Sequence, residues 1–138
     1  MKAAKKSKNK KYYTVEEANA MLPLLRSILR DITELAADLK QRHERLAKVK
    51  VPAGGPYSEE VERVHADFER DQEKLNEYIE ELSKLKVELK DPFIGLIDFL
   101  GMRDGREVYL CWRLDEPEVS FWHELDKGFA GRQPMTKE

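Results

Sequence analysis

The sequence predicts an α+β fold, a long antiparallel helical hairpin (coiled-coil-like) capped at its open end by a three-stranded antiparallel β-meander. Three observations lead to this prediction: two long segments with apolar residues at spacings of three and four, a breaker-rich loop between them, and a strong hairpin signal after them. A chain of 138 residues suits one domain. We expect a disordered Lys-rich tail at 1–11 and a single domain at 12–138, with the helical hairpin at 12–90 and the meander and C-terminal loop at 91–138.

The first helix begins at a capping box. Thr14 stands three residues before Glu17, so each side chain can accept a hydrogen bond from the other residue's backbone N–H. Apolar positions then recur at spacings of four and three over residues 18–46, a heptad pattern typical of coiled coils. Pro23 removes one backbone hydrogen bond within this pattern. We therefore expect a kink, or a short helix that restarts near Leu22.

The second helix follows a loop at residues 51–57, whose sequence VPAGGPY is too rich in breakers for a helix or strand. The apolar spacing resumes over residues 61–89, and Asp91-Pro92 ends it, because a residue before proline avoids the helical region. Two long helices joined by a short loop pack antiparallel, since neither can bury its apolar stripe alone. We expect residues 40–70 to protrude as a two-helix arm.

The C-terminal third contains a predicted β-hairpin. Strand-like segments at 95–102 and 106–114 flank Asp104-Gly105, and both turn residues tolerate the positive φ that a two-residue turn needs. Such a turn pairs residues whose numbers add up to 209. Asp98 then lies opposite Cys111.

A third strand is expected at 118–123, after a turn near Glu116-Pro117, with Trp122 opposite Cys111. Side-chain alternation then assigns each residue to a face. The inner face, which covers the helices, comprises Ile97, Phe99, Val108, Leu110, Trp112, Val119, Phe121 and His123. The outer face is mixed and comprises Leu96, Asp98, Leu100, Met102, Glu107, Tyr109, Cys111, Arg113, Ser120, Trp122 and Glu124. It is too apolar to face water, so we expect the tail or a second subunit to cover it.

Several motifs resemble the signature segments of a known family. They are TVEEAN at 14–19 with LPLL at 22–25, GLIDF at 95–99, GREVYLCWRL at 105–114 and WHELDKGFAGRQP at 122–134. These segments resemble an uncharacterised bacterial domain-of-unknown-function family, the one with serial number 2203. The resemblance implies the fold and a prokaryotic origin, and it implies no activity.

A candidate ligand site lies on the outer face and in the glycine-containing loop that follows. Its outer-face residues are Asp98, Tyr109, Arg113 and Trp122, and His123, Asp126 and Arg132 follow them in the chain. A carboxylate and a guanidinium beside aromatic rings suit a small polar molecule or an anion, and glycines let backbone approach a ligand. The alternative is that Asp98 and Arg113 form an ordinary ion pair at an oligomer interface.

Cys111, His123 and Asp126 offer a thiolate, an imidazole and a carboxylate, which together suit zinc. The predicted register places Cys111 and His123 on opposite faces, which breaks a metal site and also a Cys–His nucleophile pair. We therefore expect no metal, no cofactor and no catalytic residue. The sequence also has no P-loop, no Rossmann glycine pattern and no His-Glu-x-x-His.

Charge is distributed unevenly along the chain. Six of the 25 basic residues lie in residues 1–11, which contain no acidic residue, so the remaining 19 face 27 acidic ones. A basic tail can contact phosphates, but no aromatic residue interleaves its lysines to stack on bases. We therefore do not expect strong nucleic-acid binding. There is no apolar run long enough for a membrane, and a single cysteine suits a reducing, cytoplasmic setting.

The functional hypothesis from the sequence is a non-enzymatic protein-interaction module. We expect a homodimer that associates through the outer sheet face, and an unknown protein partner on the helical arm. The first alternative is a small-molecule or anion-binding protein, or an enzyme, with its site on the meander and the glycine-containing loop. The second alternative is weak nucleic-acid binding through the tail.

Overall fold

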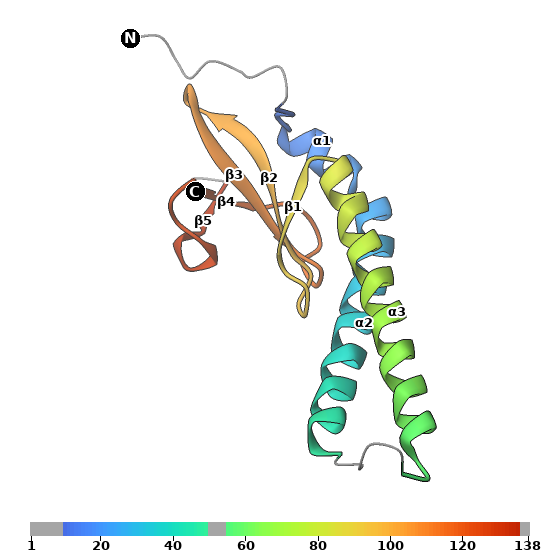
Figure 1. Cartoon of the computed structure of the whole chain (residues 1–138). Coiled ribbons are helices and arrows are strands. Elements are labelled where there is room, and N and C mark those ends of the chain that lie inside the picture. Colours follow the sequence, from blue (N-terminus) through green and yellow to red (C-terminus); the bar gives the residue numbers. More distant parts are fainter. Residues whose placement is uncertain (1–9, 50–54, 136–138) are drawn as a thin grey trace.

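The computed structural model of the chain describes residues 10–49 and 55–135. Over these residues the fold is α+β, with three α-helices and a five-stranded antiparallel sheet of order β1-β2-β3-β4-β5 (Figure 1). The α+β class is confirmed, but the sheet has five strands where three were expected. Most of the expected tail and part of the expected loop at 51–57 lie outside the described residues.

The first helical stretch is divided into α1 (Val15–Ala20) and α2 (Leu22–Lys48). The Thr14 hydroxyl accepts the Glu17 backbone N–H at 3.0 Å, and the Glu17 carboxylate accepts the Thr14 N–H at 3.0 Å, so the capping box is confirmed. Pro23 lies in the first turn of α2. Backbone N–H groups in the first turn make no hydrogen bond within the helix, so proline, which lacks this group, costs no helical hydrogen bond there. Of the two expected outcomes, the structure shows the restart at Leu22, but the restarted helix is 27 residues long rather than short.

The third helix, α3 (Ser58–Lys84), is shorter than the predicted one and is followed by strand β1 (Val87–Asp91). Lys86 has a φ of 63°, a left-handed conformation that ends the helix. The expectation of helix up to residue 89 is wrong, because Val87 and Leu89 alternate with polar residues and pair with β2. Their apolar side chains fit a strand as well as a helical stripe, and pairing with the sheet decides between the two.

Strands β2 (Leu96–Arg103) and β3 (Arg106–Arg113) form the predicted hairpin. Asp104 and Gly105 have φ values of 54° and 77°, as a two-residue hairpin turn requires. Every pair in the ladder follows the predicted register, with Asp98 opposite Cys111 among them.

Strand β4 (Phe121–Glu124) is one residue out of the predicted register. Cys111 lies opposite Phe121 rather than opposite Trp122. Because side chains alternate between faces, a shift of one residue exchanges the faces of the whole strand. The predicted placement is therefore wrong for this strand: Phe121 and His123 belong to the outer face, and Trp122 to the inner one.

The loop between β3 and β4 explains the shifted register. The Glu116 side chain accepts the Arg113 backbone N–H at 2.9 Å, and the Glu116 carbonyl accepts the Trp112 indole N–H at 3.2 Å. Asn19 of α1 accepts the Val119 backbone N–H at 2.7 Å. These contacts favour a wider loop than the tight turn expected at residues 116–117. One of them joins residues a hundred positions apart, so it is not a local sequence signal.

The helices lie against one face of the sheet, and the C-terminal segment (residues 125–135) loops away from the helices before it joins the sheet edge (Figure 1). This segment includes a short 3₁₀ helix, Phe129–Gly131, and strand β5 (Gln133–Pro134), which pairs with β4. The core unites the apolar stripe of α2 with the inner sheet face; its fully buried members include Leu25, Leu29, Ile32, Ile97, Phe99, Val108 and Trp112. The distal ends of α2 and α3 extend beyond the sheet (Figure 1). Among the described residues, none of the helices is both long and apolar enough to span a membrane.

Candidate metal centre

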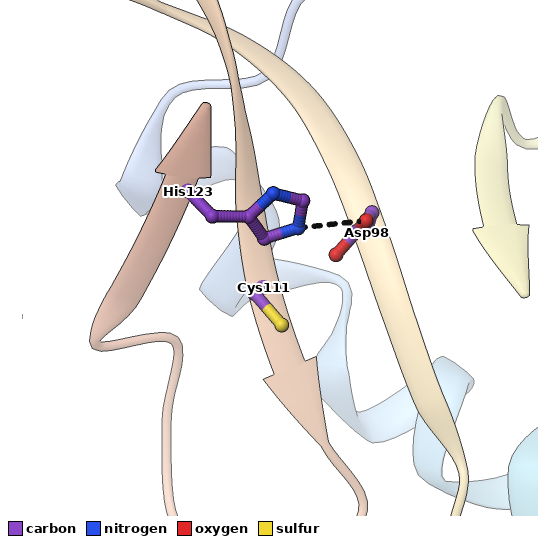
Figure 2. Close-up of side chains that lie close together, drawn as sticks. All are labelled: Asp98, Cys111 and His123. Carbon is purple, nitrogen blue, oxygen red and sulfur yellow. Dashed lines mark hydrogen bonds and ion pairs between the residues drawn. The ribbon is translucent and has the colours of Figure 1, made fainter. Parts of the chain in front are cut away.

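Three neighbouring strands bring one metal-ligating side chain each to the same place on the outer face. Asp98 comes from β2, Cys111 from β3 and His123 from β4, and Figure 2 shows the three side chains converging. Their ligand atoms all lie within 4.8 Å of one another. The three residues are 1%, 1% and 3% exposed. The prediction that Cys111 and His123 lie on opposite faces, which spoke against a metal site, is therefore wrong.

Hydrogen bonds orient the His123 ring within this cluster. Nδ1 lies 2.8 Å from the Glu124 carbonyl oxygen, which can only accept, so Nδ1 carries a hydrogen. Nε2 then lies 2.9 Å from Oδ2 of Asp98 (Figure 2). A single proton joins these two atoms, held either by the carboxyl group or by the ring. The other Asp98 oxygen, Oδ1, is buried and has no hydrogen-bond partner among the described residues.

Burial governs the protonation of this cluster. It raises the pKa of the Asp98 carboxyl group, and the adjacent His123 ring opposes that effect without cancelling it. Burial also raises the pKa of the Cys111 thiol to about 12, and the Asp98 carboxylate acts in the same direction. The thiol is consequently neutral near pH 7 and is a poor nucleophile on its own. A bound cation would be needed to hold it as a thiolate.

The cluster forms the floor of a cavity of about 160 Å³. Tyr109, on the same face, is part of its wall; its hydroxyl donates to Glu88 at 2.8 Å, and burial raises its pKa to about 12. The remaining lining residues are Lys90, Leu96, Leu125, Lys127, Gly128 and Phe129. Lys90 and all four C-terminal lining residues are exposed, whereas the three residues of the cluster are buried, so the cavity joins the buried cluster to the surface.

A partly buried ion pair holds the C-terminal segment over the outer face. The Arg132 guanidinium donates to both carboxylate oxygens of Glu116, at 2.8 and 2.6 Å, and to the Cys111 carbonyl at 3.3 Å. The Phe129 ring lies 4.7 Å from the Arg132 guanidinium and 5.4 Å from that of Arg113. The chain's own C-terminal segment covers the cluster, which neither the tail nor a second subunit was needed to do. The described end of the tail does reach another part of this face, where the Lys10 ammonium lies 3.1 Å from the Glu107 carboxylate.

The predicted ligand-site residues divide into two groups. Asp98, Tyr109 and His123 come together at the cavity, with Cys111 beside them. Arg113 instead pairs with Asp115 at 2.6 Å, so the predicted Asp98–Arg113 ion pair is wrong. The others lie apart from the cavity lining: Trp122 is buried on the inner face, Asp126 is exposed, and Arg132 pairs with Glu116.

Sequence reasoning named all three residues of the cluster, but grouped the metal ligands as Cys111, His123 and Asp126. Asp98 takes the place of Asp126 in the structure. The predicted pairing of Asp98 with Cys111 could have identified Asp98 as a metal ligand, because it already places a carboxylate beside the thiol. Either register of β4 turns one aromatic residue to each face, so hydrophobicity alone does not determine the side of His123.

The comparisons with known proteins agree with the motif resemblance. No curated protein and no solved structure matches the chain. Residues 11–135 match a family described as an uncharacterized conserved protein, and this match covers the whole sheet and the converging cluster. The chain therefore belongs to the DUF2203 family of uncharacterized conserved proteins.

Proposed function

We propose that this chain is a zinc-binding protein whose ion is held by Asp98, Cys111 and His123. The observation that carries the proposal is the convergence of three different metal-ligating side chains, all buried, with their ligand atoms within 4.8 Å of one another. A carboxylate, a thiolate and an imidazole form a donor set that suits zinc. The proposal departs from the expectation of no metal, which depended on the β4 register.

Charge balance and orientation both favour an ion at this cluster. The Glu124 carbonyl holds Nδ1–H of His123, so Nε2 can offer its lone pair, as is usual for metal-bound histidines. When deprotonated, Asp98 and Cys111 supply two negative charges, which match Zn²⁺ and leave a buried site neutral. An ion also provides a partner for the Asp98 carboxylate, whose Oδ1 accepts no hydrogen bond from the described residues.

The spacing of the ligand atoms requires only small movements. Zinc–ligand distances of about 2.0–2.3 Å place two ligand atoms of a tetrahedral site roughly 3.5 Å apart. Here Nε2 of His123 and Oδ2 of Asp98 are 2.9 Å apart, and all ligand atoms lie within 4.8 Å. Binding therefore separates the first two atoms and draws in the thiolate by about 1 Å, within the reach of side-chain rotation. The ion replaces the shared proton and the thiol proton.

This proposal takes the place of the interaction module expected from the sequence. A homodimer formed through the outer sheet face requires that the chain leave that face uncovered. Asp98 and Cys111 on that face are each only 1% exposed, beneath the C-terminal segment. The reason for expecting self-association there is thus removed. A protein partner on the helical arm and phosphate contacts through the tail stay predictions.

Metal titration of the full chain tests the proposal. Zinc content after dialysis, measured by mass spectrometry, is expected to reach one ion per chain. Cobalt(II) gives a second readout, because a thiolate bound to cobalt produces a charge-transfer band in the ultraviolet. Cys111 is the only cysteine of the sequence, so this band identifies the site. The band is expected to be absent in Cys111→Ser, with folding checked by circular dichroism.

Two aspartate variants provide a matched comparison. Asp98→Asn removes a proposed ligand and is expected to weaken zinc binding at least about tenfold. Asp126→Asn changes an exposed carboxylate outside the cluster and is expected to bind zinc as the wild type does. Absence of zinc binding by the wild type, or equal affinities for these two folded variants, would contradict the proposal.

A further inference from the structure

We infer that the open coordination position of the metal takes a small carboxylate ligand, which binds in the cavity beside Lys127. The inference rests on the proposed zinc centre and adds the class of molecule that it binds. A zinc ion with three protein ligands keeps a fourth position for water or substrate. Within residues 10–49 and 55–135, no fourth histidine, cysteine or acidic residue joins Asp98, Cys111 and His123.

The cavity is the available space for that fourth ligand. All three proposed metal ligands line it, and its volume is about 160 Å³. A cavity needs a volume of only about 10–15 Å³ to hold one water molecule, so this cavity is larger than a single bound water requires. Pockets for drug-sized molecules measure about 300–1,000 Å³. The cavity therefore suits a ligand with only a few carbon atoms.

The charges around the cavity favour an anion. Lys90 and Lys127 both line it. Lys90 already has partners, since its ammonium lies 3.0 Å from Glu88 and 5.5 Å from the Tyr109 ring centroid. The Lys127 side chain has no salt bridge or hydrogen bond within the described part of the chain. Because the proposed zinc centre is neutral, Lys127 contributes to the cavity lining a positive charge that no acidic group of the described residues pairs with.

The rest of the lining favours a carboxylate with a short carbon chain over an inorganic anion. Leu96, Leu125 and Phe129 supply apolar wall, and the Tyr109 ring adds to it. A small carboxylate can bind the metal and Lys127 through its oxygens while its carbon chain contacts this wall. Inorganic phosphate gains nothing from the apolar surface. The cavity is therefore expected to prefer propionate to phosphate.

The test is a titration of the cobalt-loaded full chain with propionate at constant ionic strength, with the visible bands of cobalt as the readout. The bands are expected to shift and saturate, at lower concentrations for propionate than for phosphate. Lys127→Met is expected to weaken propionate binding about fivefold, the effect of losing one unit charge about 4 Å away in water. Lys48→Met, an exposed lysine near the distal end of α2, is the matched control.

The outcomes separate this inference from the proposed function. If cobalt binds but propionate leaves the bands unchanged, the inference is overturned and the metal centre stands. Equal weakening in Lys127→Met and Lys48→Met, or tighter binding of phosphate, overturns it as well. If cobalt does not bind at all, both the metal centre and its ligand are refuted.

Discussion

Glu116 is predicted to act as a latch that keeps the C-terminal segment over Cys111. Glu116→Gln removes the charge that faces Arg132 while keeping a side chain of similar shape. The Arg132 and Glu116 side chains are 10% and 12% exposed and share two hydrogen bonds, at 2.8 and 2.6 Å. We expect the variant to open the segment and expose the thiol, since Arg132 also donates to the Cys111 carbonyl.

The expected size of the effect follows from burial. Removing one partner of a buried ion pair costs about 3–5 kcal/mol, because the other charge is left without compensation. The Glu116–Arg132 pair is only partly buried, exposed ion pairs contribute about 0–1 kcal/mol, and the introduced glutamine retains one acceptor for the guanidinium. We therefore expect an intermediate cost of about 1.5–2 kcal/mol. Each 1.4 kcal/mol is about a tenfold change in an equilibrium, so the open population rises roughly 10- to 30-fold.

The assay is the rate at which a chromogenic disulfide reagent modifies the metal-free protein. Cys111 is the only cysteine and is 1% exposed, so the rate reports how often the segment opens. Glu118→Gln, a change at a neighbouring exposed glutamate, is the control and should label at the wild-type rate. Chemical denaturation of both variants distinguishes local opening from global unfolding. Equal labelling rates in the two folded variants would refute the latch.

Two further predictions concern acid and the end of α3. Burial opposes ionisation of Glu116, but hydrogen bonds from Arg132 and the Arg113 backbone outweigh it and lower its pKa below 4.5. The latch is therefore fully present above pH 4.5 and is lost as the pH falls through the lowered folded-state pKa. Labelling with an acid-active pyridyl disulfide should rise over that range in the wild type but not in Glu116→Gln, and parallel profiles would argue against this. Lys86 has a φ of 63°, so Lys86→Gly is expected to stabilise the fold by about 0.5–1 kcal/mol, whereas Lys84→Gly, in the last turn of α3, is expected to destabilise it by about as much. Denaturation midpoints measure both, and a destabilised Lys86→Gly protein would contradict the strain argument.

The elements that the sequence predicted well are those with a local cause. The capping box at Thr14 and Glu17, the restart at Pro23 and the turn at Asp104-Gly105 depend on residues a few positions apart. The whole register of β2 against β3 follows from that one turn, because a two-residue loop leaves a single way to pair the strands.

The elements that the sequence did not predict depend on residues far away in the chain. Residues 87–90 fit the end of a helical stripe as well as a strand, and the open edge of β2 selects the strand. The short β5 has no recognisable pattern, and it pairs with β4 next to the long-range contact between Arg132 and Glu116.

The sequence by itself determined the α+β class, the stripe of α2, the β2–β3 register and the pairing of Asp98 with Cys111. Only the tertiary structure decided the side of His123, because the Glu116 and Asn19 contacts set the width of the loop before β4. A strand has a period of two, so one residue of loop length moves a histidine from the core to the side of a thiol and a carboxylate. Turn chemistry is local, whereas loop length depends on the packing of distant residues.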